Sequence, residues 1–246
     1  MIIRYINIWL SPETGFDDDY RYEFTLHTRF ICHFLSMRIR KIKFLTDGSF
    51  DMISVSPKPQ GIESVSIRGI GALNVVVPFN KKKYDSIKNK SSFEYYLELL
   101  QQGFYTASQH KNIPLDILND LIIEFRNNGY KNEWLFKKRR FKEYDFEVFL
   151  NCSFSSYDFE LEILVKKIST SESLINGIII RTLPHENYFD KMFKDIVIEN
   201  GNLIITYANN SPRVVIQIEN ILKKKFQFEL VGNEEIKKIL SYNGNG

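Results

Sequence analysis

The sequence predicts an α+β fold in which mostly antiparallel sheets pack with a helical hairpin and an N-terminal helix. The first observation is that apolar residues in the first half follow helical spacing over long segments. The second is that the other half alternates apolar and polar residues over short segments, with Asn, Ser and Gly between them. Strands that follow one another directly in sequence favour antiparallel pairing, and this arrangement is typical of α+β folds.

Length and composition bound the domain organisation. The chain has 246 residues, of which 43% are hydrophobic, and this supports a single compact α+β domain over residues 1–246. A subdivision into a mixed half with the helical pair, residues 1–130, and a β-rich half, residues 131–246, stays open. With 33 basic and 30 acidic residues the net charge is +3, which excludes a histone-like polycation and an acidic disordered tail.

The N-terminal stretch Met1–Trp9 predicts a first strand. It differs from a signal peptide because Arg4 interrupts its apolar run and no small-residue cleavage site follows. No run approaches 18 uncharged apolar residues, so we expect no membrane-spanning segment and no membrane partner. A secreted disulfide scaffold would carry more cysteines than Cys32 and Cys152, so we expect two unpaired thiols in a reducing cytoplasm.

The segment from residue 20 to residue 46 contains no Gly, Pro or Asn and is too long for one strand. Asp17–Asp19 is a favourable helix start, and basic residues follow where they complement the other end of the helix dipole. The pattern therefore predicts a helix near 18–38 and then a strand at 41–45. After a turn, two further strands are expected at 50–56 and 72–77.

Two amphipathic helices are expected next. Ser91 and Glu94 are three positions apart and form a capping box, and the apolar residues that follow keep helical spacing as far as Phe104. The second helix begins near Pro114, which suits a first turn, and ends before Asn127–Gly129. Because the connector is short, the two helices are predicted to pack as a helical hairpin.

After Gly129 the pattern changes to a period of two, as expected for strands with one buried face. Asn200-Gly201 between two of these strands indicates a tight hairpin. Short helices are expected at 187–194 and 234–240. The predicted strands are 134–141, 146–154, 159–167, 178–181, 196–199, 203–207, 214–218 and 226–230.

Histidines and cysteines show no spacing that binds a metal. No C-x-x-C, H-x-x-x-H or H-E-x-x-H pattern occurs, and His27 and His33 would point to different sides of one helix. We therefore expect no metal, no cofactor and no enzyme activity. The one isolated catalytic candidate is His185, which precedes Glu186 in a loop after a proline.

A glycine-rich segment and a pair of glutamates could each indicate a functional site, but each also has a structural explanation. Gly69-Ile70-Gly71 lacks the third glycine of a dinucleotide fingerprint and precedes a strand, so it predicts a turn or bulge. Glu160 and Glu162 lie two apart on a predicted strand and therefore share one face. A solvated face is a more common explanation for such a pair than a catalytic dyad.

Basic residues form three clusters, at Lys81–Lys83, Lys137–Arg140 and Lys223–Lys225. The middle cluster lies among aromatic residues, next to Trp134, and this combination can bind single-stranded nucleic acid. On a strand, however, alternate residues face opposite ways, so its charges are split between two faces. Lysines also protect a sheet edge from unwanted pairing. We therefore do not expect a nucleic-acid partner.

Two segments, Gly129–Lys138 and Ile6–Pro12, resemble immunity proteins that bacteria encode beside polymorphic or contact-dependent toxins. The β-rich α+β plan with a helical pair is similar too. The resemblance implies a cytoplasmic, non-catalytic protein that neutralises the C-terminal domain of a cognate toxin by direct association. Two other functions stay open: an enzyme that acts on nucleic acid or nucleotides, and a structural or assembly accessory protein. A homodimer also stays open.

The immunity-protein resemblance has no catalytic residues to transfer. Many immunity proteins against nucleases are acidic, whereas this chain is slightly basic and would need a local acidic patch. The dense acidic cluster Asp17, Asp18 and Asp19, with Tyr20 beside it, is the candidate toxin-binding site. Helix capping is the competing explanation for at least one of these aspartates. Trp134 is expected to be buried against the helical pair.

Overall fold

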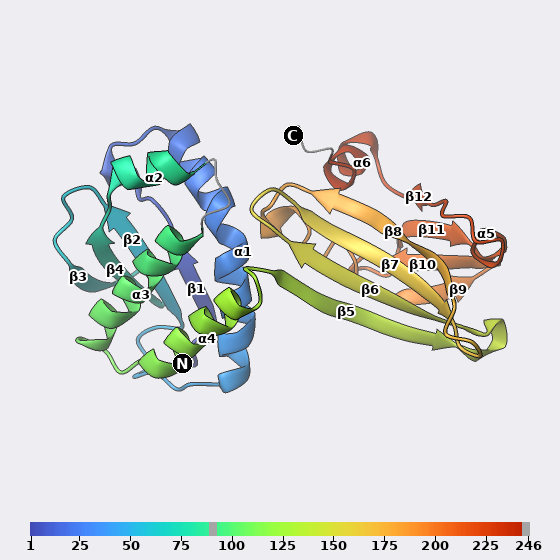
Figure 1. Cartoon of the computed structure of the whole chain (residues 1–246), viewed down its shortest axis with the longest axis horizontal. Coiled ribbons are helices and arrows are strands. Elements are labelled where there is room, and N and C mark those ends of the chain that lie inside the picture. Colours follow the sequence, from blue (N-terminus) through green and yellow to red (C-terminus); the bar gives the residue numbers. More distant parts are fainter. Residues whose placement is uncertain (89–92, 243–246) are drawn as a thin grey trace. The chain divides into compact units, whose positions relative to one another are not determined.

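The computed structural model describes residues 1–88 and 93–242 and has an α+β fold (Figure 1). The chain divides into two compact units between Asn132 and Glu133. This division falls close to the boundary after residue 130 that the sequence left open. The expectation of one domain over the whole chain stays a prediction.

The first unit is built on a four-stranded sheet in the order β1-β2-β4-β3. β1 pairs with β2 and β2 with β4 in parallel, while β3 pairs with β4 antiparallel. β1 and β2 can pair in parallel because the long helix α1 connects them and returns the chain to the same end of the sheet. The described strand pairs of the other two sheets are antiparallel. The strands are β1 (Tyr5–Ile8), β2 (Met52–Lys58), β3 (Ser64–Arg68) and β4 (Ala72–Pro78).

The expected N-terminal helix is confirmed as α1 (Asp18–Ile42), which runs beyond its predicted end. Asp17 caps the helix, since its Oδ1 accepts a hydrogen bond from the backbone N–H of Tyr20 at 2.7 Å. The strand predicted at 41–45 is wrong. Residues with good helix propensity continue α1 until Lys43 adopts a left-handed conformation with a φ of 55°.

The helical hairpin is confirmed as α3 (Glu94–Ser108) and α4 (Leu115–Asn127), which pack on each other. Arg126 of α4 donates three hydrogen bonds of 2.9–3.1 Å to the carboxylate of Glu94 on α3. The predicted cap Ser91 lies outside the described residues. The short helix α2 (Lys81–Ile87), which lies between β4 and the hairpin, was not predicted.

The second unit holds two four-stranded sheets, in the orders β5-β6-β7-β8 and β12-β11-β10-β9. The first consists of β5 (Asn132–Phe141), β6 (Phe146–Phe154), β7 (Phe159–Lys167) and β8 (Ser173–Thr182). The second consists of β9 (Ile196–Glu199), β10 (Asn202–Thr206), β11 (Pro212–Gln217) and β12 (Glu229–Leu230). The described part of this unit also contains the α-helices α5 (Ile218–Leu222) and α6 (Glu234–Leu240).

Most strands of the second unit agree with the sequence pattern. β6, β7, β9 and α6 have the predicted bounds, and β5, β10 and β11 lie within two residues of them. Of the last predicted strand, 226–230, only the two residues of β12 form a strand. The helix expected at 187–194 is wrong: only a 3-10 turn forms at Glu186–Tyr188, because Phe189 and Phe193 stack on Phe159 instead.

Glycine turns occur where the sequence placed them. Asn200 and Gly201 join β9 to β10 with φ values of 49° and 75°, the positive pair that a tight hairpin needs. Gly69 and Gly71 have φ values of 53° and 86° and join β3 to β4, so the predicted turn is confirmed.

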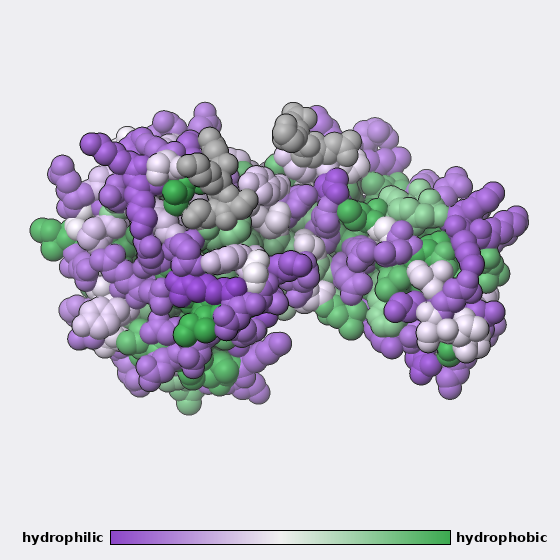
Figure 2. Space-filling model, in the orientation of Figure 1, coloured by the Kyte–Doolittle hydropathy of each residue, from purple (hydrophilic) through white to green (hydrophobic). Residues whose placement is uncertain are grey.

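The described residues contain no helix with both the length and the apolar character needed to cross a bilayer. Cys32 and Cys152 are buried free thiols, as predicted. Figure 2 shows hydrophobic residues in small groups among hydrophilic ones on the visible surface. Scattered exposed apolar residues of this kind are normal for folded proteins.

Candidate functional site

The sheet β5–β8 has one buried face and one partly exposed face. Side chains alternate between buried and partly exposed positions along the whole of β6 and most of β7. This alternation follows from the opposite directions of successive side chains on a strand. We call the partly exposed face the open face; it carries Asn151, Ser153, Glu160 and Glu162.

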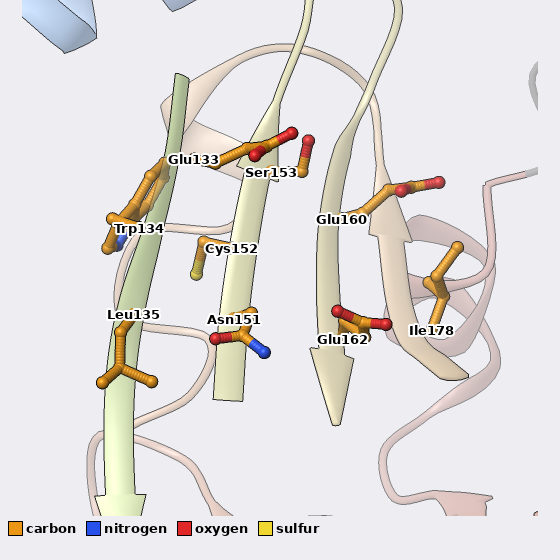
Figure 3. A pocket seen from close by; sticks show the side chains of 9 residues that line it. All are labelled: Glu133, Trp134, Leu135, Asn151, Cys152, Ser153, Glu160, Glu162 and Ile178. Carbon is orange, nitrogen blue, oxygen red and sulfur yellow. The ribbon is translucent and has the colours of Figure 1, made fainter. Parts of the chain in front are cut away.

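A groove of about 550 Å³ lies at the end of this sheet where β5 and β7 begin and β6 ends (Figure 3). Its lining comes from all four strands of the sheet. Glu133, Trp134 and Leu135 of β5 line one side, and the polar residues of the open face line the centre.

The strand register places the groove residues in two cross-strand rows. In one row, Ser153 of β6 lies opposite Glu160 of β7, which lies opposite Arg181 of β8. In the other row, Asn151 lies opposite Glu162, which lies opposite Ile178. The two glutamates therefore have different neighbours on β8, although they are only two positions apart.

Because their neighbours on β8 differ, only one of the two glutamates has its charge compensated by a described residue. The Arg181 guanidinium donates from Nε to Oε1 of Glu160 at 2.8 Å and lies 3.6 Å from Asp158, so the charge of Glu160 is compensated. Within residues 1–88 and 93–242, Glu162 has no ion-pair partner. The negative charge of the open face is therefore concentrated at Glu162, beside the Asn151 amide that Figure 3 shows directed toward it.

Two further groove residues are Cys152 and Trp134. Burial raises the pKa of the Cys152 thiol well above its usual range, so the sulfur stays protonated and is a poor nucleophile. Trp134 is partly exposed, and its ring centroid lies 6.1 Å from that of Phe159. Trp134 is thus partly buried against its own sheet, and its expected burial against the helical pair stays a prediction.

The basic cluster on β5 is divided between two carboxylates, as the alternation predicted. Lys137 and Arg139 bind Asp195 at 3.4 and 2.8 Å, whereas Lys138 and Arg140 bind Glu147 at 2.9 and 3.4 Å. The hydrogen bonds from Arg139 hold the pKa of Asp195 well below its usual range. Each carboxylate therefore compensates part of the charge on its side of the strand.

The candidate residues Asp17, Asp18 and Asp19 are all exposed at the start of α1. Asp17 is the helix cap, and Asp18 forms an ion pair with Arg21 one turn later. Helix capping therefore explains the presence of Asp17, in agreement with the prediction that at least one of these aspartates is a cap. Asp19 is exposed in the first turn of the helix. Whether a partner binds these three residues stays a prediction.

Tyr20 belongs to a local aromatic and charged cluster instead of standing free beside the aspartates. Its hydroxyl donates to Oδ1 of Asp85 at 2.9 Å, and its ring packs on Phe16 and Tyr84. Burial, followed by the bond to Asp85, raises the pKa of Tyr20 well above its usual range. The missed helix α2 supplies Asp85, so sequence reasoning could not place this neighbour.

The histidines lie in separate environments. His27 Nδ1 is 3.4 Å from the Tyr96 hydroxyl, whereas His33 Nδ1 is 3.0 Å from the Asn132 amide nitrogen. His185 Nδ1 accepts a hydrogen bond from the backbone N–H of Asn187 at 3.2 Å and so caps the 3-10 turn. Among the described residues, no three His, Cys, Asp or Glu side chains are grouped to hold a metal ion.

Sequence reasoning placed Glu160 and Glu162 on one face but missed the groove around them. Alternation assigns residues to a face, whereas only the register between strands brings Ser153 and Arg181 beside Glu160. Comparisons of the chain with protein-family models, with curated proteins and with solved structures found no match.

Proposed function

We propose that this chain is a non-catalytic binding protein that neutralises the C-terminal domain of a bacterial toxin by direct association. The observation that carries the proposal is the groove on the sheet β5–β8, whose lining includes the Trp134 side chain and the uncompensated carboxylate of Glu162. The resemblance of Gly129–Lys138 to toxin immunity proteins supports the choice of partner, and this segment contributes the start of β5 to the groove.

The groove suits a basic side chain of a protein partner. An arginine from the partner can bind a carboxylate through two hydrogen bonds and can stack its guanidinium on an indole ring. Tryptophan and arginine are also the residue types that most often anchor protein interfaces. In the proposed complex Glu162 supplies the carboxylate contact for such an arginine, and Trp134 supplies aromatic surface elsewhere along the groove.

The strands hold these groups in place before binding. β6 and β7 pair over nine successive residues each, from Phe146↔Lys167 to Phe154↔Phe159. A preorganised surface loses little conformational freedom on binding, so more of the contact energy appears as affinity. Inhibition by association alone requires such affinity, on the order of nanomolar or tighter, because free toxin continues to turn over.

The groove alone is too small for a stable interface, which buries about 1,200–2,000 Å² in total. The remaining contact area comes from the rest of the open face. There Phe149 lies under two lysines, with Nζ of Lys138 4.6 Å and Nζ of Lys166 5.9 Å from its ring centroid. The proposed interface therefore has an acidic end at Glu162 and a basic end at Phe149.

The proposal places the encounter in the cytoplasm, where Cys32 and Cys152 would stay reduced. A second copy of the chain is the competing occupant of the open face, as in a homodimer. Sedimentation of the isolated chain at micromolar concentration separates these occupants, because a homodimer changes mass without any toxin domain.

The direct test measures binding of the full chain to the C-terminal domain of the adjacent gene product by titration calorimetry. Glu162→Arg reverses the charge of the groove, and we expect it to weaken binding at least about thirtyfold. Glu199→Arg is the matched control, since Glu199 is an exposed strand-end glutamate of the same unit. Circular dichroism checks that both variants fold.

Each outcome has a defined consequence. Tight binding by the wild type and the Glu199 variant, with weak binding by the Glu162 variant, supports the proposal. Absence of binding by the wild type would remove the toxin domain as partner, and equal binding by both variants would remove the groove as the contact. Divalent-ion-dependent cleavage of nucleic acid that Glu162→Gln abolishes would support the alternative enzyme.

A further inference from the structure

A second cavity, of about 580 Å³, lies in the first unit beyond the carboxyl ends of the parallel strands β2 and β4. Pro59 and Gln60, which follow β2, line one side, and Pro78–Asn80, at the end of β4, line another. Figure 1 shows α2 at this end of the sheet. In open sheets, ligands bind in the crevice outside the carboxyl ends of parallel strands, where the following loops diverge.

The charge of this cavity is positive. Three lysines, Lys81, Lys82 and Lys83, line it together with one carboxylate, Glu98. Lys81 binds Asp85 at 2.5 Å, and Lys83 pairs with Glu98. Across the described ranges 1–88 and 93–242, Lys82 has no ion-pair partner and is exposed. An anion that enters the cavity therefore meets one uncompensated ammonium group between two compensated ones.

The polar groups of the cavity are fixed by bonds within the unit. The backbone N–H of Asn80 donates to the Tyr95 hydroxyl at 2.7 Å, and the Asn80 side chain accepts from the backbone N–H of Lys83 at 3.0 Å. Gln102 of α3 donates to Glu63 at 2.8 Å, and this bond fixes the Gln102 side chain. Groups that are already ordered recognise a ligand at a lower entropic cost.

The remaining walls are apolar. Phe79 and Leu99 are almost fully buried and line the cavity with the rings of Pro59 and Pro78. Cavities of about 300–1,000 Å³ with mostly apolar walls and a few placed polar groups are typical small-molecule sites. The lining thus has a basic part at the lysines and an apolar part at the prolines. A ligand with an anionic group at one end and a flat apolar group at the other would match both parts.

We infer that this lysine pocket binds a small phosphate ester that carries an aromatic ring, with Lys82 as the phosphate contact. The ammonium group of Lys82 supplies charge-assisted hydrogen bonds to the phosphate oxygens. The ring lies against Pro59, Pro78 and Leu99. This site is independent of the groove on the sheet β5–β8, because its lining comes from the first unit alone.

The test uses calorimetric titration of the full chain with AMP, adenosine and inorganic phosphate at low ionic strength. We expect saturable binding of AMP that is at least about tenfold tighter than binding of adenosine or phosphate, since AMP alone fills both parts of the pocket. Raising the salt concentration should weaken AMP binding, because the contact with an exposed lysine is screened.

Two matched variants localise the binding. Lys82→Gln removes the uncompensated charge and should weaken AMP binding about tenfold while leaving the toxin-domain affinity unchanged. Lys225→Gln is the control, because Lys225 is an exposed lysine that belongs to another run of three lysines, Lys223–Lys225. It should bind AMP as the wild type does.

Three results would overturn the inference. Absence of saturable AMP binding up to millimolar concentration would exclude the site. Equal losses in the Lys82 and Lys225 variants would mean that surface charge alone attracts the ligand. Phosphate binding as tight as AMP binding would exclude the aromatic part of the ligand from the pocket.

Discussion

Asn132 Nδ2 lies 3.0 Å from His33 Nδ1 and donates to the carbonyl oxygen of Phe30 at 2.8 Å. Because an amide nitrogen only donates, Nδ1 of His33 acts as the acceptor and carries no proton. Burial lowers the pKa of His33 to about 4, and the charge of Arg40 adds to this effect. The folded protein thus holds a neutral imidazole at this position at physiological pH.

The neutral imidazole gives a first prediction, on stability against pH. The pKa of His33 rises from about 4 in the folded chain to its usual 6.5 in the unfolded chain, so the unfolded chain takes up the proton first as the pH falls. The contribution of neutral His33 to the free energy of unfolding is complete above pH 6.5 and is lost as the pH falls from 6.5 to about 4. Relative to His33→Gln, the free energy of unfolding of the wild type should fall by about 1–3 kcal/mol more over this range.

Urea denaturation at several pH values measures this difference. His110→Gln is the matched control, because His110 is exposed at the end of α3. Its profile should parallel that of the wild type. A wild-type profile parallel to that of the His33 variant would show that His33 does not titrate differently in the two states.

A second prediction concerns the close approach of α3 to β2. A Cβ atom at Gly103 would lie 2.4 Å from Cγ2 and 2.9 Å from Cγ1 of Val55, which has no exposed surface. Gly103→Ala should lower the free energy of unfolding by about 1–3 kcal/mol, although alanine favours a helix. In combination with Val55→Ala, which removes both methyl groups, the loss should be smaller than the sum of the single losses. Strictly additive losses in denaturant unfolding would contradict the contact.

A third prediction concerns the two thiols. Cys32 and Cys152 are 3% and 2% exposed, and burial raises the pKa of Cys152. Both thiols should react with an aromatic disulfide reagent at pH 8 at least about a hundred times more slowly in the native chain than in guanidinium, because reaction requires an accessible thiolate. The single variants Cys32→Ala and Cys152→Ala assign the two rates. Labelling of the native wild type within seconds would refute the burial of at least one thiol.

A fourth prediction tests the acidic start of α1 as a steering site for the toxin domain. Changing Asp17, Asp18 and Asp19 together to Asn should slow association about three- to tenfold at low salt and flatten its dependence on ionic strength. Folding should survive, because asparagine also caps helices and the exposed pair of Asp18 with Arg21 adds little stability.

Stopped-flow association rates at several salt concentrations provide the measurement for this steering test. The control changes Glu234 and Glu235 to Gln, since these residues form another acidic helix start, at α6. Identical rates and salt slopes for the wild type and the aspartate variant would exclude the α1 cluster from steering. Equal effects in both variants would indicate net charge and not a local site.

Local pattern predicted the fold well where apolar spacing was regular over many residues. The α3–α4 hairpin, β6 and β7 have such spacing and were predicted from it, whereas α1 was predicted from its length without Gly, Pro or Asn and from the charges at its two ends. β3 was missed because the alternation of Ser64–Arg68 extends over only five residues, and α2 was missed because Lys81–Ile87 contains mostly charged residues. The 3-10 turn near Phe189 was misjudged because helical spacing there reflects two rings that stack on Phe159.

The candidate site was predicted less completely. The sequence predicted that capping explains at least one of Asp17–Asp19, which the structure shows for Asp17, and the alternation on β7 placed Glu160 and Glu162 on one face. Trp134 is partly exposed at the groove, because an aromatic residue at the start of an edge strand has few neighbours on its outer side, and its expected burial against the helical pair stays a prediction. The groove itself had no pattern in the sequence.

By itself, the sequence determined most of the helices and strands and the faces on which their residues lie, because hydrogen bonding and side-chain spacing within an element are local. Only the tertiary structure decided which charges are compensated. Glu160 lies opposite Arg181 and Glu162 lies opposite Ile178, although the two glutamates look alike in sequence. The physical reason is that electrostatic interactions depend on distance through space, and that distance is set by pairing between strands that are remote along the chain.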